Sequence, residues 1–486
     1  MSELSISNVI RVTVQGVQRG ISVKNINEVA LFTPEQPNSV APYLICIDPS
    51  DVVKAYGTDS LTAKMAQNIF AQNANLNTGK GYLVVIPMKN AVSAKAASFK
   101  TVAIDLSKLK EVEDGSLKIT TAGVAYDLSG LNFTNCANLN DVATVISNQI
   151  TACNITVDGT SLVFGAQTLG TTSSIVLSNG TGGTDVSGEN YLNVADGTTT
   201  NGTTSSGEKL EEAIERTKDQ VRYTGILTAL YMEDSAVESA SAAVNTGDFI
   251  WVNVWYSASD ISGMCKTIKE ASQQQTRCLV YTGGFEKAKL MMAAYAGRAF
   301  SVNFSGSQTS QTMNLKTLVN VTPDAGIDQT SYTSAKEYGV DLYVSYEGDP
   351  AVLSSGGNGY FDTVYENMAL KFAMQAGLYN VLKTVGTKVP QTESGMSALT
   401  NGMAQVFIQF VRNGVLAPGK WNSSQTFGDP ETFRQNISNQ GWYIYHTPIA
   451  GQAQSEREQR IAPVIQGAGK RAGAIHEADV LILIEE

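Results

Sequence analysis

A long stretch without a single basic residue divides this chain. From Ile119 to Glu208 there is no Lys or Arg, and Thr, Ser, Gly and Asn dominate. Short runs of β-forming residues recur within the stretch, and one amphipathic helix at about Asn140–Ala152 interrupts them. We therefore expect residues 99–207 to form a small inserted β-rich domain, which ends in a Thr/Ser/Gly/Asn linker at Thr198–Gly207.

The segments on either side of this insert share one pattern, in which buried strands alternate with amphipathic helices. Before the insert, this pattern covers a strand at Tyr43–Ile47, a helix at Thr62–Asn75 and a strand at Tyr82–Ile86. After the insert, strands are expected at Gly225–Tyr231, Phe249–Trp255 and Cys278–Tyr281, with helices at 235–243, 260–274 and 286–299. Such alternation is typical of α/β units. We expect one α/β core, a mixed sheet with flanking helices, built from residues 26–98 and 208–385.

The remainder of the chain contains helices and strands without this regular alternation. Val340–Tyr346 is expected to be a strand, Phe361–Val385 a long helix and Ser397–Asn413 a second helix. We expect residues 386–486 to form a C-terminal domain that ends in a strand.

Apolar strand patterns occupy both ends of the chain. Near the start, residues 1–25 form a candidate arm in which Ile10, Val12 and Val14 alternate with polar residues. At the other end, Val480, Leu481, Ile482, Leu483 and Ile484 are all apolar and call for cover on both faces of a strand. The two strands either pair with each other inside one domain or add to the sheets of neighbouring copies. A head-to-tail contact of the second kind that does not close on itself produces a helical filament.

Charge and cysteine content exclude several classes of protein. The formal net charge is −11 and no run of Lys or Arg exceeds two residues, which argues against binding to nucleic acid or to an anionic membrane. Charged residues make up only 16% of the chain, as in some surface proteins. The five cysteines include no CxxC pair, and the first ten residues lack the pattern of a signal peptide. We expect free thiols and folding in the cytoplasm, with no membrane insertion.

The sequence contains no recognisable catalytic or metal-binding motif. The two histidines, His446 and His476, are thirty residues apart and do not have the spacing of metal ligands. Neither GxSxG nor GxxxxGK[ST] occurs, and Thr78–Gly81 precedes a strand, whereas a phosphate-binding loop follows one. We expect no catalytic residues, no metal and no cofactor, and we expect that the protein is not an enzyme.

Several segments, taken in order, resemble the tail sheath proteins of contractile-tailed (myovirus-type) bacteriophages. Within the insert, the segments 114–119, 125–128 and 139–143 are similar to a module common in one branch of that family. The segments outside the insert that carry the resemblance are Ile6–Val14, Gly297–Phe304, Thr312–Lys316, Val321–Pro323, Val340–Tyr346, Gly359–Asp362, the helix from Phe361, Arg460–Pro463 and the terminal apolar strand.

The resemblance implies a structural subunit of a virion, assembled in the host cytoplasm. Such a subunit would polymerise with itself as stacked rings in a helical sheath around the tail tube protein, in contact with baseplate and tail terminator proteins. Contraction would then drive the tube through the host envelope. The family has an α/β core near the tail axis, outward-facing inserts and terminal arms that link subunits. A surface adhesin or surface-layer protein is the alternative; a tail tube protein and an enzyme with an unrecognised site are weaker ones.

Four basic residues near the C-terminus are candidates for contact with the tube. Arg457, Arg460, Lys470 and Arg471 stand out in an otherwise acidic chain. They are either simply solvated or part of a basic inner face that meets an acidic tube, a contact that salt would weaken.

Overall fold

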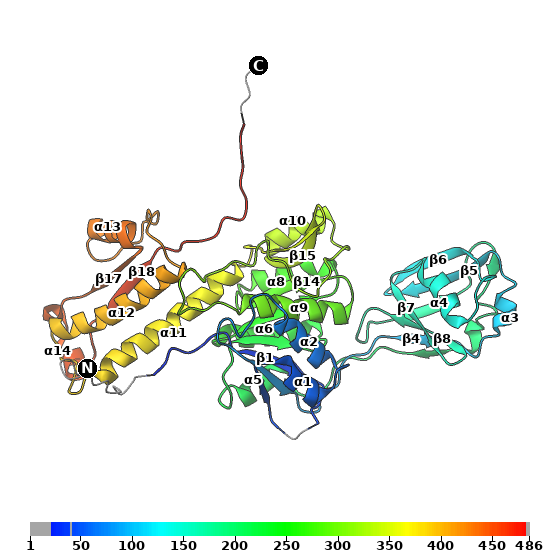
Figure 1. The fold of residues 1–486 in the computed structure, drawn as a ribbon, viewed down its shortest axis with the longest axis horizontal. Helices are drawn as coiled ribbons and strands as arrows, with labels where there is room; N and C mark the ends of the chain where they lie inside the picture. The colour runs from blue at the N-terminus through cyan, green and yellow to red at the C-terminus, as the bar shows by residue number, and fades with distance from the viewer. Residues whose placement is uncertain (1–20, 39–40, 483–486) are drawn as a thin grey trace, which may run out of the picture. The chain divides into compact units, whose positions relative to one another are not determined.

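The computed structural model describes residues 21–38 and 41–482, and their contacts group them into two compact units (Figure 1). The core unit comprises residues 27–301 and 313–361. The C-terminal unit comprises residues 302–312 and 362–482 together with the segment 21–26. The division after residue 361 differs from the expected boundary at residue 385, because the long helix from Phe361 packs on the helix that follows it.

The core unit is built on an eight-stranded mixed sheet with the order β16-β15-β14-β13-β12-β1-β3-β2. The six inner strands are parallel, and β16 and β2 are antiparallel strands at the two edges. The strands are β1 (Val29–Thr33), β2 (Leu44–Cys46), β3 (Leu83–Pro87), β12 (Gly225–Thr228), β13 (Ile250–Trp255), β14 (Thr276–Val280), β15 (Val340–Tyr346) and β16 (Asp349–Leu353). The expected mixed sheet with flanking helices is therefore confirmed.

Helices cover both faces of this sheet, so its inner strands are buried and mostly apolar. One face carries α1 (Pro49–Tyr56), α2 (Leu61–Phe70) and α9 (Phe285–Ala299). The other face carries α5 (Leu210–Thr217), α6 (Asp234–Thr246), α7 (Ser259–Ser262), α8 (Met264–Glu270) and α10 (Gln329–Tyr338). Packing between α2 and α9 is close, since a Cβ at Gly297 would lie 2.3 Å from the carbonyl oxygen of Ile69.

Two local expectations for the core were wrong. Tyr43–Ile47 is not a buried strand: β2 is an edge strand, and the side chains of Ile45 and Ile47 are exposed. The helix expected over 260–274 is broken into α7 and α8 at Gly263, whose φ and ψ angles of −92° and −110° are not helical. In both cases the apolar pattern was correct, but it does not distinguish an edge strand from a central one, or one helix from two.

The insert is a β-rich domain with its own hydrophobic core, as expected. One sheet contains β5 (Gly115–Thr121), β6 (Val124–Leu131), β9 (Ile175–Ser178) and β10 (Thr184–Asp185). The other contains β4 (Ser98–Lys100), β7 (Cys153–Asp158), β8 (Ser161–Ala166) and β11 (Thr198–Thr200). Two helices, α3 (Leu106–Leu109) and α4 (Leu139–Ser147), complete it, and α4 begins with a capping box between Asn138 and Asp141.

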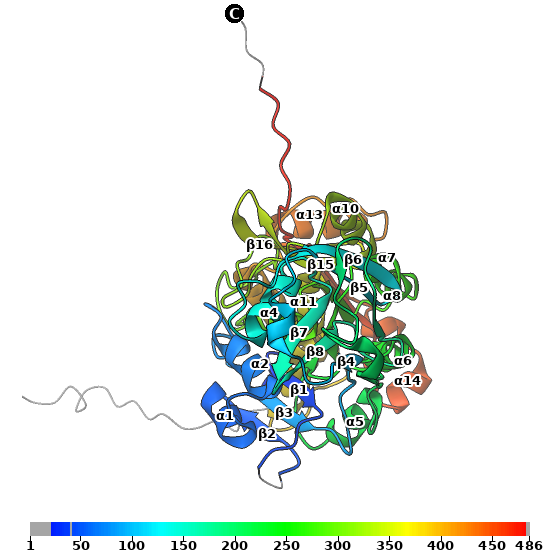
Figure 2. The same ribbon diagram turned by 90° about the vertical axis from the view of Figure 1, so that its right-hand side faces the viewer.

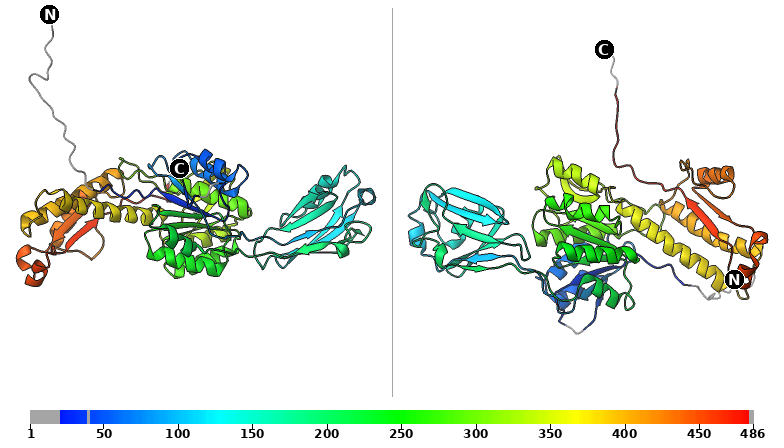
Figure 3. Two further views of the ribbon diagram at one scale, coloured as in Figure 1. Left: turned by 90° about the horizontal axis from the view of Figure 1, so that it is seen from below. Right: turned by 180° about the vertical axis from the view of Figure 1, so that it is seen from behind.

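The two chain segments that enter and leave the insert lie side by side (Figure 3). Antiparallel bridges join Val92 to Ser206 and Lys95 to Thr203. The region expected to be a plain linker therefore contains β11 and these bridges, and the insert leaves and rejoins the core at one place.

The C-terminal unit combines helices with a two-stranded sheet. Helices α11 (Phe361–Thr384) and α12 (Glu393–Asn413) pack closely at Gly377 and Gly402, where an added Cβ would lie 3.0 Å from Val406 and 2.6 Å from Val381. The sheet pairs β17 (Trp442–His446) with β18 (Ile465–Gly469). Two further helices belong to this unit: along the chain, α13 (Pro430–Gln440) precedes β17, and α14 (Gln454–Glu458) lies between β17 and β18.

Candidate functional site

The apolar residues near the C-terminus are exposed in the isolated subunit. Val480, Leu481 and Ile482 are 79%, 84% and 75% exposed, and no helix or strand is assigned between residues 472 and 482 (Figure 2). Leu483 and Ile484 lie outside the described residues, as do Ile10, Val12 and Val14 near the N-terminus. Three consecutive large apolar side chains exposed to water make this segment a candidate contact surface.

The sheet β17–β18 is the element of this unit that is open to further strands. In the described chain β17 pairs only with β18, so the sheet has two edges. An open edge presents backbone N–H and C=O groups to which an extended segment of another chain can bind.

Each face of this small sheet is partly covered. On one face, Trp442 stacks on Phe407 of α12 with ring centroids 5.6 Å apart, and Gly467 and Gly469 of β18 approach the same helix closely. On the other face, Tyr443 packs against Phe427 and Phe433, at 5.6 and 5.2 Å. Successive residues of a strand point to opposite faces, so these contacts place the sheet between two apolar layers.

The four basic candidates do not form one cluster. Arg457 and Arg460 belong to α14 and its end, before β18 begins, whereas Lys470 and Arg471 follow the end of β18. A five-residue strand spans roughly 17 Å, so the two pairs flank β18 at opposite ends. Arg460 is exposed, while Arg457, Lys470 and Arg471 are half-buried.

Arg471 is held by an ion pair that the sequence analysis missed. Its guanidinium donates to the carboxylate of Glu366, to Oδ1 of Asn367 at 2.6 Å and to the carbonyl oxygen of Thr363, all in the first turns of α11. Glu366 also accepts from Ser310, and burial raises the pKa of its carboxyl group. A sequence signal existed, because Glu366 lies on the stripe of α11 formed by Tyr365, Met368, Ala369 and Phe372, where a carboxylate needs a partner.

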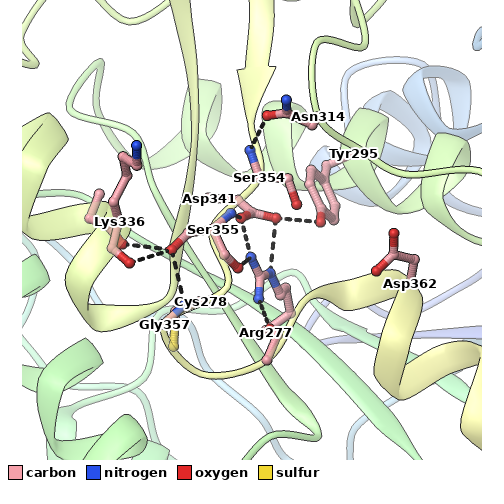
Figure 4. A network of polar contacts seen from close by, with 12 residues as sticks. Arg277, Cys278, Tyr295, Asn314, Lys336, Asp341, Ser354, Ser355, Gly357 and Asp362 are labelled. Carbon is pink, nitrogen blue, oxygen red and sulfur yellow. Dashed lines mark hydrogen bonds and ion pairs between the residues drawn. The ribbon is translucent and has the colours of Figure 1, made fainter. Parts of the chain in front are cut away.

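A second polar network lies in the core unit, at the ends of β14 and β15 (Figure 4). Arg277 donates to both carboxylate oxygens of Asp341, to the carbonyl oxygen of Ser355 at 2.7 Å and to that of Gly359 at 2.7 Å. Tyr295 donates to Asp341 at 2.6 Å, and burial, together with this carboxylate, raises its pKa. Arg277 and Asp341 are 3% and 0% exposed, so the network ties the strands to the loop after β16 and offers no surface for a substrate.

One buried amine lies at the carboxyl ends of the parallel strands. Lys289 of α9 is 1% exposed, its Nζ lies 3.3 Å from Oγ1 of Thr228, and it faces the rings of Tyr256 and Phe285. Burial lowers the pKa of this amine to about 7. A neighbouring cavity of about 50 Å³, lined by Asn253, Tyr256 and Asp260 among others, has room for a water molecule or two.

The described chain holds no group of three or more His, Cys, Asp or Glu side chains arranged to bind a metal ion. His446 lies 3.7 Å from Glu393, and His476 Nε2 is 3.0 Å from Oγ1 of Thr312. Within residues 21–38 and 41–482, no helix combines the length and the apolar character needed to cross a lipid bilayer.

Two family models match the chain, one over each of two regions. Residues 361–484 match the model "E217 tail sheath protein gp31-like, C-terminal domain". Residues 89–204 match the model "E217 tail sheath protein gp31, insert domain". The search of curated proteins found no match.

Solved structures of sheath proteins are similar over nearly the whole chain. The sheath tail protein Lin1278 from Listeria innocua is 10% identical, with 95% of this chain and 97% of that chain covered and a TM-score of 0.44. The sheath of an extracellular contractile injection system (PVC), in its contracted state, is 8% identical, with 99% and 98% covered and a TM-score of 0.48. Both TM-scores are below 0.5, and the family is indicated by the two domain models.

Proposed function

The chain belongs to the family of contractile tail sheath proteins, and from this premise we propose that it is the sheath subunit of a phage contractile tail. Copies of the chain polymerise helically around the tail tube, as stacked rings, and contract to drive the tube through the host envelope. Assembly takes place in the host cytoplasm. Sheath proteins are structural, and the subunit performs no catalysis.

The observation that carries this proposal is the exposure of Val480, Leu481 and Ile482 on a subunit that also has an open two-stranded sheet. In a strand, Val480 and Ile482 point to one face and Leu481 to the other, so both faces are apolar. The sheet β17–β18 lies between α12 on one face and the rings of Phe427 and Phe433 on the other. A strand that is apolar on both faces therefore suits this edge, where both faces of an added strand would be covered.

Energetics favour this docking mainly through the side chains. Each buried apolar side chain contributes roughly 1.5–3 kcal/mol, and ordering each residue of a flexible segment costs about 1–2 kcal/mol. The backbone hydrogen bonds add about 0.5–1.5 kcal/mol each and determine the register. Side-chain burial and backbone hydrogen bonds together exceed the ordering cost, so the arm binds a neighbour and stays bound while subunit bodies move.

The proposed partners follow from this arrangement. The first is a second copy of the chain, which receives the C-terminal arm; the arm of residues 1–25 makes the second link. The other partners are the tube protein, for which Arg457, Arg460, Lys470 and Arg471 remain contact candidates, and the baseplate and terminator proteins at the ends of the sheath.

Truncation tests the proposal. Removal of residues 478–486, or of residues 1–18, is expected to leave a folded monomer whose thermal unfolding matches that of the full chain. Negative-stain microscopy is expected to show hollow cylinders for the full chain and none for either truncated chain. Long cylinders from a truncated chain would refute the linking role of that arm.

A further inference from the structure

The N-terminal segment of the described chain lies along the second half of α11. Asn380 Nδ2 donates to the carbonyl oxygen of Ile21 at 2.8 Å, and Nζ of Lys24 lies 4.4 Å from the ring centroid of Phe372. Three residues of extended chain span about 10 Å, and the eight helical residues from Phe372 to Asn380 span about 12 Å. The two lengths agree, so residues 21–24 run antiparallel to the helix, with Ile21 nearer to its C-terminal end than Lys24.

The segment that leads to the C-terminal arm is held at the first turns of the same helix. Arg471 binds Glu366, Asn367 and the carbonyl oxygen of Thr363, as described above. Backbone hydrogen bonds hold the neighbouring residues, from Ala472 N to Val415 O at 2.9 Å and from Ala417 N to Lys470 O at 2.9 Å. From Gly473 onward the backbone carries no assigned strand up to residue 482. Residues 470–472 are therefore the root of the C-terminal arm.

We infer that α11 transmits tension between the two arms of a subunit, with Arg471 and Asn380 as the positioning residues at the two roots. The inference rests on the proposed linking role of the arms. Thr363 and Asn380 are seventeen residues apart, about 25 Å along a continuous helix. A pull on one arm therefore has a path to the other through one helix. This path runs beside the covalent path from Lys470 into β18, so α11 shares the load that the two-stranded sheet would otherwise bear alone.

The ion pair suits this role better than an apolar contact would. The guanidinium contacts the carboxylate of Glu366 through one nitrogen and binds Asn367 and the carbonyl oxygen of Thr363 through another, so the three partners together set direction as well as distance. Glu366 is nearly buried, so loss of Arg471 would leave a carboxylate without its cation. Arg471 is thereby engaged within its own subunit, in contrast to the exposed Arg460.

Hydrogen exchange in the full-length monomer tests the C-terminal root. Arg471→Met is expected to speed exchange of the Ala472 and Ala417 amides at least tenfold, with the amides of β14 and β15 unchanged. Arg460→Met is the matched control, because it removes the same charge from an exposed site. It is expected to leave exchange of the Ala472 and Ala417 amides unchanged. Arg471→Lys keeps the charge but not the planar fork. Its exchange rates at Ala472 and Ala417 are expected to lie between those of the full chain and those of Arg471→Met. Equal exchange in the Arg471→Met and Arg460→Met variants would overturn the assignment of Arg471.

Softening the helix tests the transmission of tension. Gln375→Gly combined with Lys371→Gly changes two exposed positions of α11 to the residue that weakens a helix most apart from proline. Gln375→Ala with Lys371→Ala removes the same side chains and keeps the helix stiff. Assembled sheaths of the glycine pair are expected to break into short pieces on contraction at least three times as often as those of the alanine pair. Equal lengths after contraction would overturn the inference.

The truncations keep this result separate from the proposed function. If removal of residues 478–486 abolishes assembly while the glycine pair behaves as the alanine pair, the arms link subunits and α11 does not carry their tension. If the truncated chain still assembles, the proposed linking role fails first.

Discussion

Two segments of this chain have nearly the same kind of side chains and opposite surroundings. Strand β13, Ile250–Trp255, lies in the middle of the core sheet with every side chain at most 5% exposed. The segment Val480–Ile482 is at least 75% exposed. A folded subunit with a complete core has thus left a strand-like apolar segment without cover. The difference shows that apolar sequence alone does not say whether its cover comes from the same chain or from another.

The two segments are expected to differ most when one charge is introduced into each, because the charge affects stability in β13 and assembly in Val480–Ile482. Val252→Asp is expected to lower the free energy of unfolding by about 4 kcal/mol or more, because it buries an unpaired carboxylate. Leu481→Asp is expected to change the free energy of unfolding by less than about 0.5 kcal/mol and yet to abolish assembly. Denaturant unfolding and electron microscopy of both variants measure the two effects. A large loss of monomer stability in Leu481→Asp would contradict the account.

The buried amine of Lys289 tests how much a charge inside the core costs in stability. Because its pKa is lowered to about 7, the amine releases a proton on folding between pH 7 and about 10, and the unfolded chain holds more protons in that range. Stability is therefore expected to rise with pH through this window on account of Lys289. Lys289→Met is expected to raise the free energy of unfolding at pH 7 by up to about 4 kcal/mol.

The gain from Lys289→Met is expected to shrink as pH rises toward 10, where the unfolded lysine also loses its charge. Unfolding of both proteins at pH 7, 8.5 and 10 gives the difference, in which the other titrating groups cancel. A gain that is independent of pH would show that packing, and not the charge, is responsible.

Deletion of the insert tests whether the core is complete without it. Because Val92 and Ser206 are bridged, the chain can be rejoined there by removal of residues 93–205. The remaining subunit is expected to unfold within about 1 kcal/mol of the full chain, since the insert has its own core. Insoluble protein, or a loss of several kcal/mol, would show that the core depends on the insert.

The smallest effect is expected at the proposed tube contact. Arg460→Glu is the cleaner test, since reversal at Arg471 would also break the pair with Glu366. Binding of the variant to tubes is expected to fall a few-fold at low salt and to match the full chain at high salt, because exposed charges are screened. Tube binding equal to that of the full chain at both salt concentrations would remove Arg460 from the contact.

Much of the core could be predicted because its signals are local. The apolar runs that became β3, β13 and β15 and the helices between them follow from periodicity within about fifteen residues. The edge position of β2 could not be predicted, since it depends on which strand lies beside it. The position of β18, Ile465–Gly469, could not be predicted either, since Gly467 and Gly469 have no strand-forming side chains and lie close to Phe407 of α12.

The candidate interface was predictable in part. The apolar character of Val480–Ile484 was evident from the sequence. The sheet β17–β18 depends on pairing between strands separated by α14, and the root at Arg471 depends on a contact with Glu366, 105 residues earlier. Glu366 illustrates the limit: its place on an apolar helix face calls for a cation, but only the fold shows that Arg471 supplies it.

Hydrogen exchange of the amides from residue 478 to residue 482, compared between monomer and assembled sheath, tests the central claim most directly. In the monomer these amides are expected to exchange near the rate of an unstructured peptide. In the sheath they are expected to exchange at least a hundredfold more slowly, because they become part of a neighbour's sheet. Protection already present in the monomer, or none in the sheath, would contradict the central claim.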